Sequence, residues 1–388
     1  MPLFPGDRGL CRFIRRRGKV LLVTCLLLTV INLSGILVYP FERDLNDNFS
    51  YPLDRPDFRR IVYLQLNGQD VDVKPINAYD YRFINLNAGK CDRVTSTPHQ
   101  NASAAVTGDN DSPFPRLVFV IKSNLSNRRH RDTIRKTWGF EKRFSDVEIR
   151  RVFVVGSCDS DSGPELVRQT AKSNKRTTSC QDLIDEENLI HGDIVQADFI
   201  DSYYNNTIKT MIGLKWLTST CPDAEFAFFV DDDYYVSTKN LLKFTRNPFP
   251  AEQATDLFDF DGRLYAGYVF ATSSPMRHKI SKWYVSLDEY PYSRYPPYVT
   301  AGAYLLSNRA FKELQIASRY VKHFRFDDIY MGILSKKIGL TPTHSSEFYF
   351  YKKAYDAASY SSVIASHGFD DHQELTRVWI EQKSLGNC

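Results

Sequence analysis

The chain has 388 residues, of which 43% are hydrophobic and 14% aromatic, and its formal net charge is +4. This length is enough for one large domain or two ordinary ones. Six basic residues stand before residue 20, so the remainder is close to neutral and shows no footprint of nucleic-acid binding.

The first predicted element is a membrane anchor. The run Val20–Tyr39 contains no charge, and a helix of that length covers a bilayer core of about 30 Å. A cleaved signal peptide is the alternative, but its apolar region is usually only about 7–15 residues long. The positive-inside rule places the basic tail, residues 1–19, in the cytosol. We therefore predict a single-pass type II membrane protein with a lumenal body.

The cysteines and the N-x-[ST] triplets fit a lumenal body. Five of the seven cysteines follow the anchor at wide spacings with no C-x-x-C pair, which argues against a zinc site. One or two disulfides suit an oxidising compartment and leave one thiol over, with Cys388 and Cys91 as the candidates. The candidate glycosylation sites are Asn48, Asn101, Asn124 and Asn205.

Residues 40–114 predict a lumenal stem, since Asp, Asn, Pro and Ser are frequent there. Within it, residues 58–66 fit a short strand. A body of residues 115–388 follows, in which strands and helices alternate. The predicted strands are 116–123, 147–156, 193–201, 226–230, 264–270 and 299–307. The predicted helices are 127–139, most of 163–191, 205–220, one from about 308, and 327–339. This alternation predicts an α/β layered, largely parallel sheet.

The segment Phe226–Ser237, FAFFVDDDYYVS, leads an apolar strand directly into three aspartates. Ligands of open α/β sheets bind beyond the carboxyl ends of the strands. In an extended backbone Asp231 and Asp233 point to one side and Asp232 to the other. Two carboxylates on one side predict a site for Mg²⁺ or Mn²⁺, which in turn indicates a diphosphate substrate. The alternative is a solvated acidic turn.

Basic residues surround the predicted turn between the first strand and the first helix of the body. Arg131 and Arg135 are four residues apart and share a helix face. Arginines beside the free amides of a helix start are typical of an anion site. A solvated basic helix face is the alternative interpretation.

Three later segments carry further candidates. Asp327 and Asp328 open a helix, where a carboxylate is either a general base or a residue favoured by the helix dipole. The loop YPPYVTAGAYLLS holds Tyr298 and Gly302, which suit either close approach of a ligand or core packing. His367 is either a metal ligand or a structural histidine.

Together these segments resemble a known family. R-x-x-I-R-x-T-W at Arg131–Trp138, VDDDYYV, YPPYVTAGAYLLS and FDDIYMG are similar to motifs of the β-1,3-glycosyltransferases of family 31, Golgi enzymes with a GT-A fold. The resemblance covers about residues 115–370. Within the family, YPPYVTAGAY, FRFDDIYMG and VIASHGF look most like the brainiac-like branch, which adds N-acetylglucosamine in β-1,3 linkage to mannose on a glycosphingolipid.

The resemblance implies a fold and roles for individual residues. The implied fold is a GT-A type, Rossmann-like mixed sheet flanked by helices, in a single catalytic domain behind the transmembrane helix. Asp328 matches the catalytic base, and Asp327 stands where many members have Glu. The implied metal ligands are Asp233, Asp231 and His367. The implied donor-nucleotide residues are Lys122, Arg131, Arg135, Asp231 and Asp232. The residues implied to lie near the sugars are Trp283, Tyr298 and Gly302.

The predicted function follows from these roles. It is an inverting transfer, dependent on Mn²⁺ with Mg²⁺ as a substitute, of N-acetylglucosamine from a UDP-sugar to a glycolipid or glycan acceptor such as mannosyl-glucosylceramide. Transfer of galactose to another glycan is the alternative within the family. Outside it, the alternatives are a catalytically inactive lumenal carbohydrate-binding protein and a metal-dependent hydrolase.

Overall fold

The computed structural model describes residues 7–46, 49–50, 57–92, 115–158, 179–246 and 262–388, with side chains described from residue 17 onwards. The chain forms two compact units. Unit 1 contains Met1–Asp54 and Thr272–Pro296, and unit 2 contains Arg55–Ala271 and Pro297–Cys388. The predicted glycosylation sites Asn48 and Asn101 lie outside the described residues.

Unit 1 contains helix α1 (Asp7–Ser34) and the 3-10 helix η1 (Ile36–Phe41). Its segment Arg17–Ser34 has a mean hydropathy of 1.5 and no buried residue, so it is long and apolar enough to cross a membrane. The helix ends before the predicted limit of Tyr39, because Gly35 adopts the left-handed conformation with φ 71°. A Cβ at this position would also lie 2.2 Å from the backbone oxygen of Arg277.

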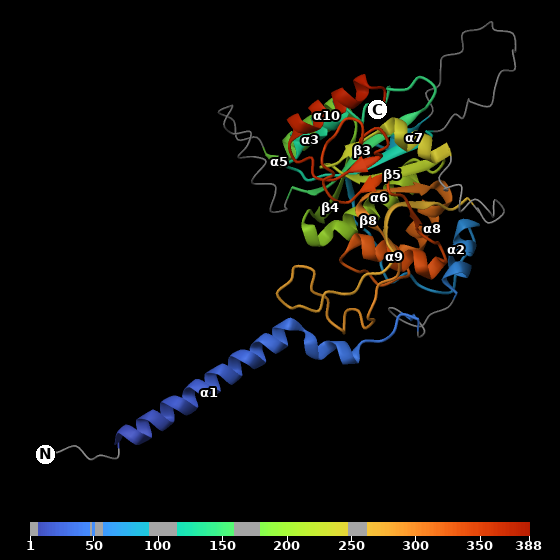
Figure 1. Cartoon of the computed structure of the whole chain (residues 1–388). Coiled ribbons are helices and arrows are strands. Elements are labelled where there is room, and N and C mark those ends of the chain that lie inside the picture. The colour runs from blue at the N-terminus through green and yellow to red at the C-terminus, as the bar shows by residue number, and fades with distance from the viewer. Residues whose placement is uncertain (1–6, 47–48, 51–56, 93–114, 159–178, 247–261) are drawn as a thin grey trace, which may run out of the picture. The chain divides into compact units, whose positions relative to one another are not determined.

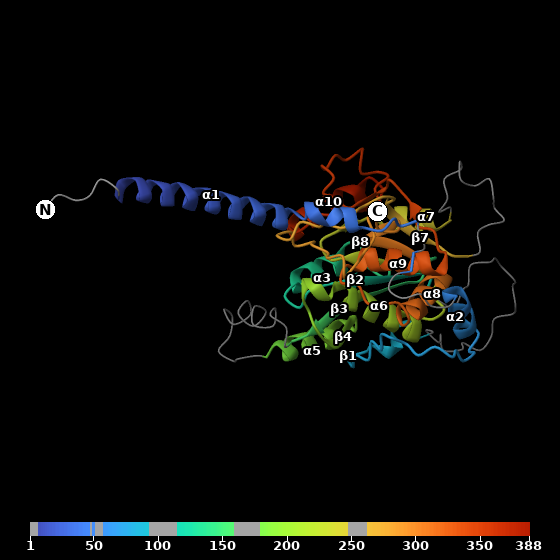
Figure 2. The same ribbon diagram turned by 90° about the horizontal axis from the view of Figure 1, so that it is seen from below.

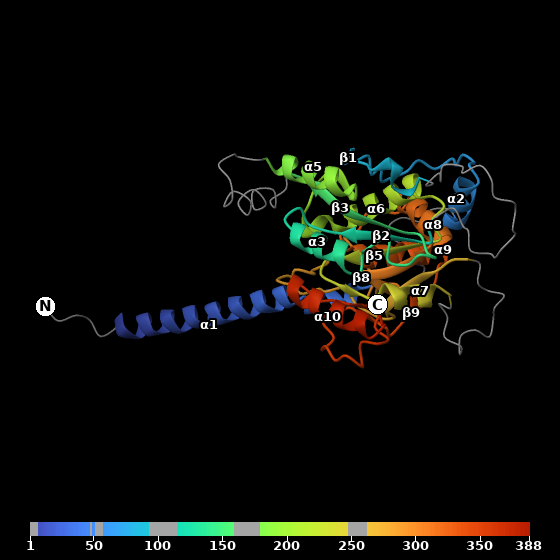
Figure 3. The same cartoon turned by 90° about the horizontal axis from the view of Figure 1, so that it is seen from above.

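Unit 2 is built on a mixed sheet, as predicted. Within the described residues, eight strands follow the order β1-β4-β3-β2-β5-β8-β7-β9 (Figure 3). Strands β2 to β5 run parallel, whereas β8 is antiparallel to both β5 and β7. The strands are β1 (Phe83–Asn85), β2 (Leu117–Lys122), β3 (Ile149–Ser157), β4 (Ile194–Ile200), β5 (Phe226–Asp231), β7 (Tyr265–Phe270), β8 (Tyr298–Ser307) and β9 (Thr343–His344).

A smaller sheet with the order β10-β11-β6 continues from β5. Its strands are β6 (Tyr235–Val236), β10 (Phe348–Tyr349) and β11 (Ala365–Ser366). Only three residues, with a turn at Asp232 and Asp233, separate Asp231 at the end of β5 from Tyr235 at the start of β6. This connection brings the C-terminal segment, with His367 directly after β11, beside the three aspartates.

Helices cover both faces of the large sheet (Figure 1). The helices above it in this view are α3 (Arg128–Lys136), α5 (Cys180–His191), α7 (Thr238–Arg246) and α10 (His372–Ser384). The helices below it are α6 (Asn206–Thr220), α8 (Asn308–Ser318) and α9 (Asp327–Ile338). Each predicted helix that falls on described residues is confirmed, and residues 163–178 lie outside them.

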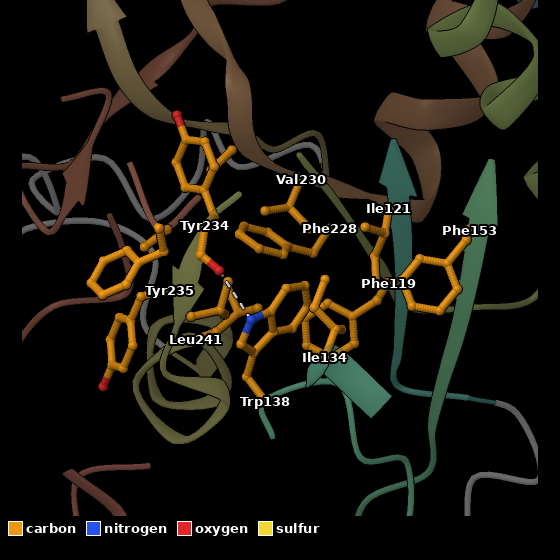
Figure 4. Close-up of a cluster of buried hydrophobic side chains, with 14 of the residues drawn as sticks. Phe119, Ile121, Ile134, Trp138, Phe153, Phe228, Val230, Tyr234, Tyr235 and Leu241 are labelled. Atoms are coloured by element: carbon orange, nitrogen blue, oxygen red, sulfur yellow. Dashed lines mark hydrogen bonds between the residues drawn. The ribbon is translucent and has the colours of Figure 1, made fainter. Parts of the chain in front are cut away.

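A buried aromatic and aliphatic cluster joins α3 to the sheet (Figure 4). The Trp138 ring lies 5.5 Å from that of Phe119, and Phe119 lies 5.8 Å from Phe228. Full burial of a side chain of this size typically stabilises the fold by about 2–3 kcal/mol. The indole Nε1 of Trp138 also donates to the backbone oxygen of Tyr234 at 3.0 Å. The cluster therefore fixes the turn that carries the aspartates.

The prediction of a strand at residues 58–66 is wrong. This segment is helix α2 (Phe58–Leu66), and Asp57 caps it by accepting from the backbone amides of Arg59 and Arg60. Its buried residues Phe58, Ile61 and Val62 have the i, i+3, i+4 spacing of one helix face. Residues 57–92 of the predicted stem thus pack as a part of unit 2, whereas its described residues 40–46 and 49–50 belong to unit 1.

The cysteines behave as expected of a protein in an oxidising compartment. Disulfides join Cys91 to Cys221 and Cys158 to Cys180, and Cys388 is free and buried. The first disulfide includes Cys91, the last residue of the 3-10 helix η2 (Ala88–Cys91), which follows β1; β1 lies beside β4 (Figure 2). It ties the segment before residue 93 to the end of α6.

Candidate active site

A buried lysine joins two of the predicted acids at the carboxyl edge of the sheet. Strands β2 and β5 run side by side, so their last residues, Lys122 and Asp231, are paired. The Nζ atom of Lys122 lies 3.0 Å from Asp231 and 2.9 Å from Asp327, and it donates to the backbone oxygen of Ala301 at 3.0 Å. Burial alone would lower the pKa of Lys122, but the two carboxylates raise it.

The two aspartates that open α9 have different surroundings. Asp327 is buried and accepts hydrogen bonds from Lys122 and from the hydroxyl of Thr210. Asp328 is only partly buried, and its side chain accepts a hydrogen bond from the amide of Ile329 at 2.8 Å. Burial raises the pKa of Asp328 to about 7, and the charge of Asp327 contributes to this rise. Asp328 is therefore the more available proton acceptor.

Asp233, which precedes β6, and His367, which follows β11, lie at the same end of the small sheet because these two strands are antiparallel. The Nε2 atom of His367 lies 3.1 Å from Oδ2 of Asp233, and this hydrogen bond raises the pKa of the imidazole. The other oxygen of Asp233, Oδ1, is buried and has no hydrogen-bond partner among the described residues. A buried oxygen of this kind costs free energy unless a ligand satisfies it.

Asp231 belongs to the same group of charges. Burial raises its pKa to about 7; Lys122 opposes this rise and the charge of Asp233 adds to it, although 37% of the Asp231 side chain remains exposed. The carboxylates at this edge thus outnumber the cations that neutralise them. A cation bound nearby would relieve the repulsion.

Asp232 has a structural environment that differs from the predicted nucleotide contact. Its side chain is buried and accepts from the hydroxyl of Ser123 at 2.6 Å and from the amide of Asn127 at 3.1 Å. Burial raises its pKa, whereas these hydrogen bonds lower it. Asn127 is the N-cap residue of α3, as predicted, but its side-chain amide donates to Asp232 and forms no capping hydrogen bond with the helix. The backbone turns at Asp232 and Asp233 instead of staying extended, and the partners of Asp232 differ from those of Asp231 and Asp233, so Asp232 holds the loop that contains Ser123 and Asn127.

The two arginines predicted to bind the nucleotide are buried in ion pairs, which corrects that prediction. The guanidinium of Arg131 is fully buried and forms two hydrogen bonds with Glu187, at 2.8 and 2.7 Å. Arg135 pairs with Glu187 and Asp193, both at 2.7 Å. Arg131 also donates to the hydroxyl of Ser123, the residue that holds Asp232. These arginines support the loop from inside and have no face open to a diphosphate.

A bulge in β8 shapes the floor of the site. Gly267 pairs with Tyr304 but Val269 pairs with Val299, so β8 carries extra residues between them. The bulge contains Ala301, which binds Lys122, and Gly302, where a Cβ would lie 2.0 Å from the Tyr234 hydroxyl. Glycine is thus required for the close approach of Tyr234. Sequence reasoning missed Tyr234, although it directly follows the aspartates.

The other predicted residues lie as follows. Tyr298 is buried, and its Cβ would be 2.6 Å from a Cβ placed on Gly332 of α9, so it packs between β8 and that helix. Trp283 is half exposed in unit 1, where the ammonium of Lys282 lies 4.5 Å from its ring. Of the described glycosylation candidates, Asn124 accepts from the amide of Ser126, and Asn205 donates to the backbone oxygen of Ile200.

The residues present fit a divalent cation that has few protein ligands. The unpartnered oxygen of Asp233 is the observation that supports this fit, and His367 adds a nitrogen beside it. The described part of the chain contains no cluster of three or more His, Cys, Asp or Glu residues arranged to hold a metal. Mg²⁺-type ions typically bind one or two carboxylates and complete their coordination with substrate phosphates and water.

The chain is similar to known galactosyltransferases. The β-1,3-galactosyltransferase brn of Drosophila melanogaster is 40% identical over 376 residues, which cover 96% of this chain and 99% of that protein. The β-1,3-galactosyltransferase bre-5 of Caenorhabditis elegans is 36% identical over 256 residues, or 65% of this chain and 71% of that protein. Among solved structures, the galactosyltransferase LgtC in complex with donor and acceptor sugar analogs is 14% identical, with a TM-score of 0.31. The matched region covers 70% of this chain and 100% of the LgtC chain.

A family match spans the body of the chain. Residues 129–346, more than half of the sequence, match the family described as Galactosyltransferase. This match includes the three aspartates, β8 and its bulge, and the start of α9. The resemblance of the motifs is thereby confirmed, and the chain belongs to the galactosyltransferase family, whose members are glycosyltransferase enzymes.

Proposed function

We propose that this chain is an inverting β-1,3-glycosyltransferase that transfers a sugar from a UDP-sugar to a hydroxyl of a glycan or glycolipid. The observation that carries the proposal is the difference in environment between Asp328, at the start of α9, and Asp233, just after β5. Asp328 has a pKa raised to about 7 and is held by one backbone amide, while Asp233 keeps a buried oxygen unpartnered beside His367.

Asp328 acts as the general base in this proposal. A base works best when its pKa lies near the working pH, because it is then largely ionised and still accepts a proton readily. Asp328 would take the proton of the acceptor hydroxyl as that oxygen attacks the anomeric carbon of the donor. The bond between this carbon and the diphosphate breaks with inversion, and the electron pair leaves with UDP.

Asp327 is a positioning residue in this scheme. Its hydrogen bonds with Lys122 and Thr210 hold the first turn of α9, and its charge raises the pKa of Asp328. Lys122 in turn connects this turn to Asp231, on which the donor nucleotide would lie. The proton acceptor and the donor side of the site are thus held by one buried ammonium group.

Asp233 and His367 would hold Mn²⁺, or Mg²⁺ in its place, with Asp231 nearby. When bound, such an ion neutralises the negative charge of the leaving diphosphate. The support for this assignment is the unpartnered Asp233 oxygen and the excess of carboxylates, both described above. The inner positions of Arg131 and Arg135 mean that neither arginine takes over this role.

The donor and acceptor follow from the branch that the motifs resemble. We propose N-acetylglucosamine as the transferred sugar and mannosyl-glucosylceramide as the acceptor. Galactose is the alternative, and the similarity to brn and bre-5, both named as β-1,3-galactosyltransferases, favours it. The apolar segment Arg17–Ser34 supports the further proposal of a type II Golgi membrane protein with a lumenal unit 2. Glycosylation at Asn124 and Asn205 is part of this proposal.

A donor screen tests the proposed function. The full chain, purified in detergent, would be incubated with UDP-N-acetylglucosamine or UDP-galactose, with and without Mn²⁺, and with mannosides or other sugars as acceptors. We expect release of UDP that requires both Mn²⁺ and an acceptor. A release that is equally fast without any acceptor would instead indicate a hydrolase, and no release with any pair would contradict the proposal.

A further inference from the structure

An aromatic surface lies beside the acids, on the side of β7. It consists of Tyr268 and Phe270, at the end of β7, and of Phe350 and Tyr351, directly after β10. The ring of Phe350 lies 4.6 Å from that of Tyr268 and 5.1 Å from that of Phe270. Tyr351 continues the row at 5.2 Å from Phe350. We call these four residues the aromatic platform.

The strand pairing places the platform at the same edge of the sheet as the acids. Strand β8 is antiparallel to β5, so its beginning lies at the end of β5, where Asp231 stands. Strand β7 is in turn antiparallel to β8, and Phe270 pairs with Tyr298. Tyr298 packs on α9 at Gly332, one helical turn after Asp328. The platform therefore continues the surface that begins at the proposed base.

A second connection leads from the platform to the proposed metal ligands. Strand β10 pairs with β11, and the amide of His367 donates to the backbone oxygen of Tyr349 at 3.0 Å. Phe350 follows Tyr349 in the chain, so the platform lies one residue from the strand that positions His367. Both anchors of the platform belong to unit 2.

Part of the aromatic platform is exposed to solvent and is not used in packing. Phe350 is 36% exposed and Tyr351 is 50% exposed, whereas Tyr268 packs partly against the main hydrophobic cluster. Two neighbouring cations are engaged elsewhere, because Lys352 pairs with Glu374 at 2.6 Å and the ammonium of Lys353 lies 4.7 Å from the Tyr349 ring. The surface therefore offers aromatic faces with little free charge, which suits a neutral ligand better than an anionic one.

We propose that the aromatic platform binds the part of a neutral saccharide acceptor that lies beyond the reacting sugar. This inference rests on the transfer reaction proposed above and adds to it the place where the acceptor chain runs. The apolar C–H face of a pyranose ring packs on aromatic rings, and its hydroxyls remain in water at the edge. The acceptor would thus be recognised over at least two sugar units, of which only the first reaches Asp328.

The test compares two acceptors of different length with the full chain in detergent. The probes are methyl mannoside and the mannosyl-glucose disaccharide, and the double variant Phe350→Leu/Tyr351→Leu removes two rings while retaining apolar side chains. One aromatic contact is typically worth about 2- to 12-fold in binding. We therefore expect the KM of the disaccharide to rise by about 10-fold, while the KM of the monosaccharide and the affinity for UDP stay unchanged.

The matched control is Tyr204→Leu, since Tyr204 is 56% exposed on the 3-10 helix η3 (Tyr203–Asn205), which follows β4, and strands β3, β2, β5 and β8 separate β4 from β7. It should leave the KM of both acceptors unchanged. An unchanged disaccharide KM in the double variant, or an equal rise for both acceptors together with a lower melting temperature, would overturn the platform. A wild-type enzyme that releases no UDP with either acceptor would refute mannosyl-glucose as the saccharide bound by the platform, whereas failure with every donor–acceptor pair of the screen above would refute the transfer reaction itself.

Discussion

The Asp328→Asn substitution should nearly abolish sugar transfer while leaving donor binding intact. Asn has almost the same size as Asp but does not accept the proton of the acceptor hydroxyl. A positioned general base typically contributes about 10²- to 10⁴-fold to the rate, so kcat should fall by at least about 100-fold. The affinity for UDP in the presence of Mn²⁺, measured by calorimetry, should not change, because Asp328 takes no part in the proposed nucleotide contacts.

The pH dependence of the wild-type enzyme gives a second measure of the same role. Asp328 accepts a proton only when ionised, and its pKa is raised to about 7. Such a group is about one-eleventh ionised at pH 6 and about ten-elevenths ionised at pH 8, so kcat should rise about 10-fold over this interval. An unperturbed aspartate, with a pKa of about 3.9, would give a flat profile over the same range.

The neighbouring substitution, Asp327→Asn, is the matched comparison. The charge of Asp327 is one cause of the raised pKa of Asp328. Its removal should move the acid limb of the kcat profile to lower pH. The asparagine oxygen still accepts a hydrogen bond from Lys122 or Thr210, so the first turn of α9 should keep its place. Transfer should therefore persist in Asp327→Asn at high pH and be lost in Asp328→Asn at every pH.

Three results would refute this reasoning. If Asp328→Asn keeps more than about a tenth of the wild-type kcat, Asp328 is not the general base. If the acid limb near pH 7 persists in this variant, it belongs to another group, and Asp231 is the first candidate because its pKa is also raised to about 7. If Asp327→Asn moves the limb to higher pH, the two carboxylates are not coupled by repulsion.

Three further predictions follow from the contacts. Lys122→Met should lower the free energy of unfolding, measured in urea, by about 3–5 kcal/mol, because it leaves buried carboxylates unpaired. The control Lys336→Met, on the exposed side of α9, should change it by under about 0.5 kcal/mol. Asp233→Ala should weaken Mn²⁺ binding, measured by electron paramagnetic resonance, by more than Asp232→Ala does, because only Asp233 has a buried oxygen without a partner; equal effects would contradict the assignment. Replacing both cysteines of the Cys91–Cys221 disulfide by serine should cost about 2–5 kcal/mol, and an unchanged melting temperature would contradict it.

The sequence allowed prediction of most of the central sheet, because its strands are short apolar runs between polar turns. Strands β2, β3, β4 and β5 lie within about two residues of their predicted limits. The smaller sheet was not predicted, since its strands have only two residues each and show no periodicity. Helix α2 was misassigned as a strand because nine residues containing Phe, Ile, Val and Tyr satisfy β-propensity as well as the helical spacing.

The candidate site shows a similar limit. The aspartates could be predicted because the chemistry of three adjacent carboxylates after an apolar strand is unusual in itself. The role of the arginines could not be predicted from the sequence. Their partner Glu187 lies 56 residues from Arg131 in the chain, and only the fold shows that Glu187 is buried beside Arg131. An arginine that binds a diphosphate and one that neutralises a buried glutamate have the same sequence signal at a helix start.

The R-x-x-I-R-x-T-W segment thus stabilises the loops that carry the site residues. Arg131 holds Ser123, which holds Asp232, and Trp138 holds the backbone of Tyr234, so the turn between β5 and β6 is fixed on both sides of Asp233. Each hydrogen bond restrains a neighbour of Asp233, and none satisfies its buried oxygen. A turn that is fixed in this way, with one carboxylate oxygen left without a partner, meets the requirements of the proposed cation site, because a bound cation would offset the repulsion among the acids.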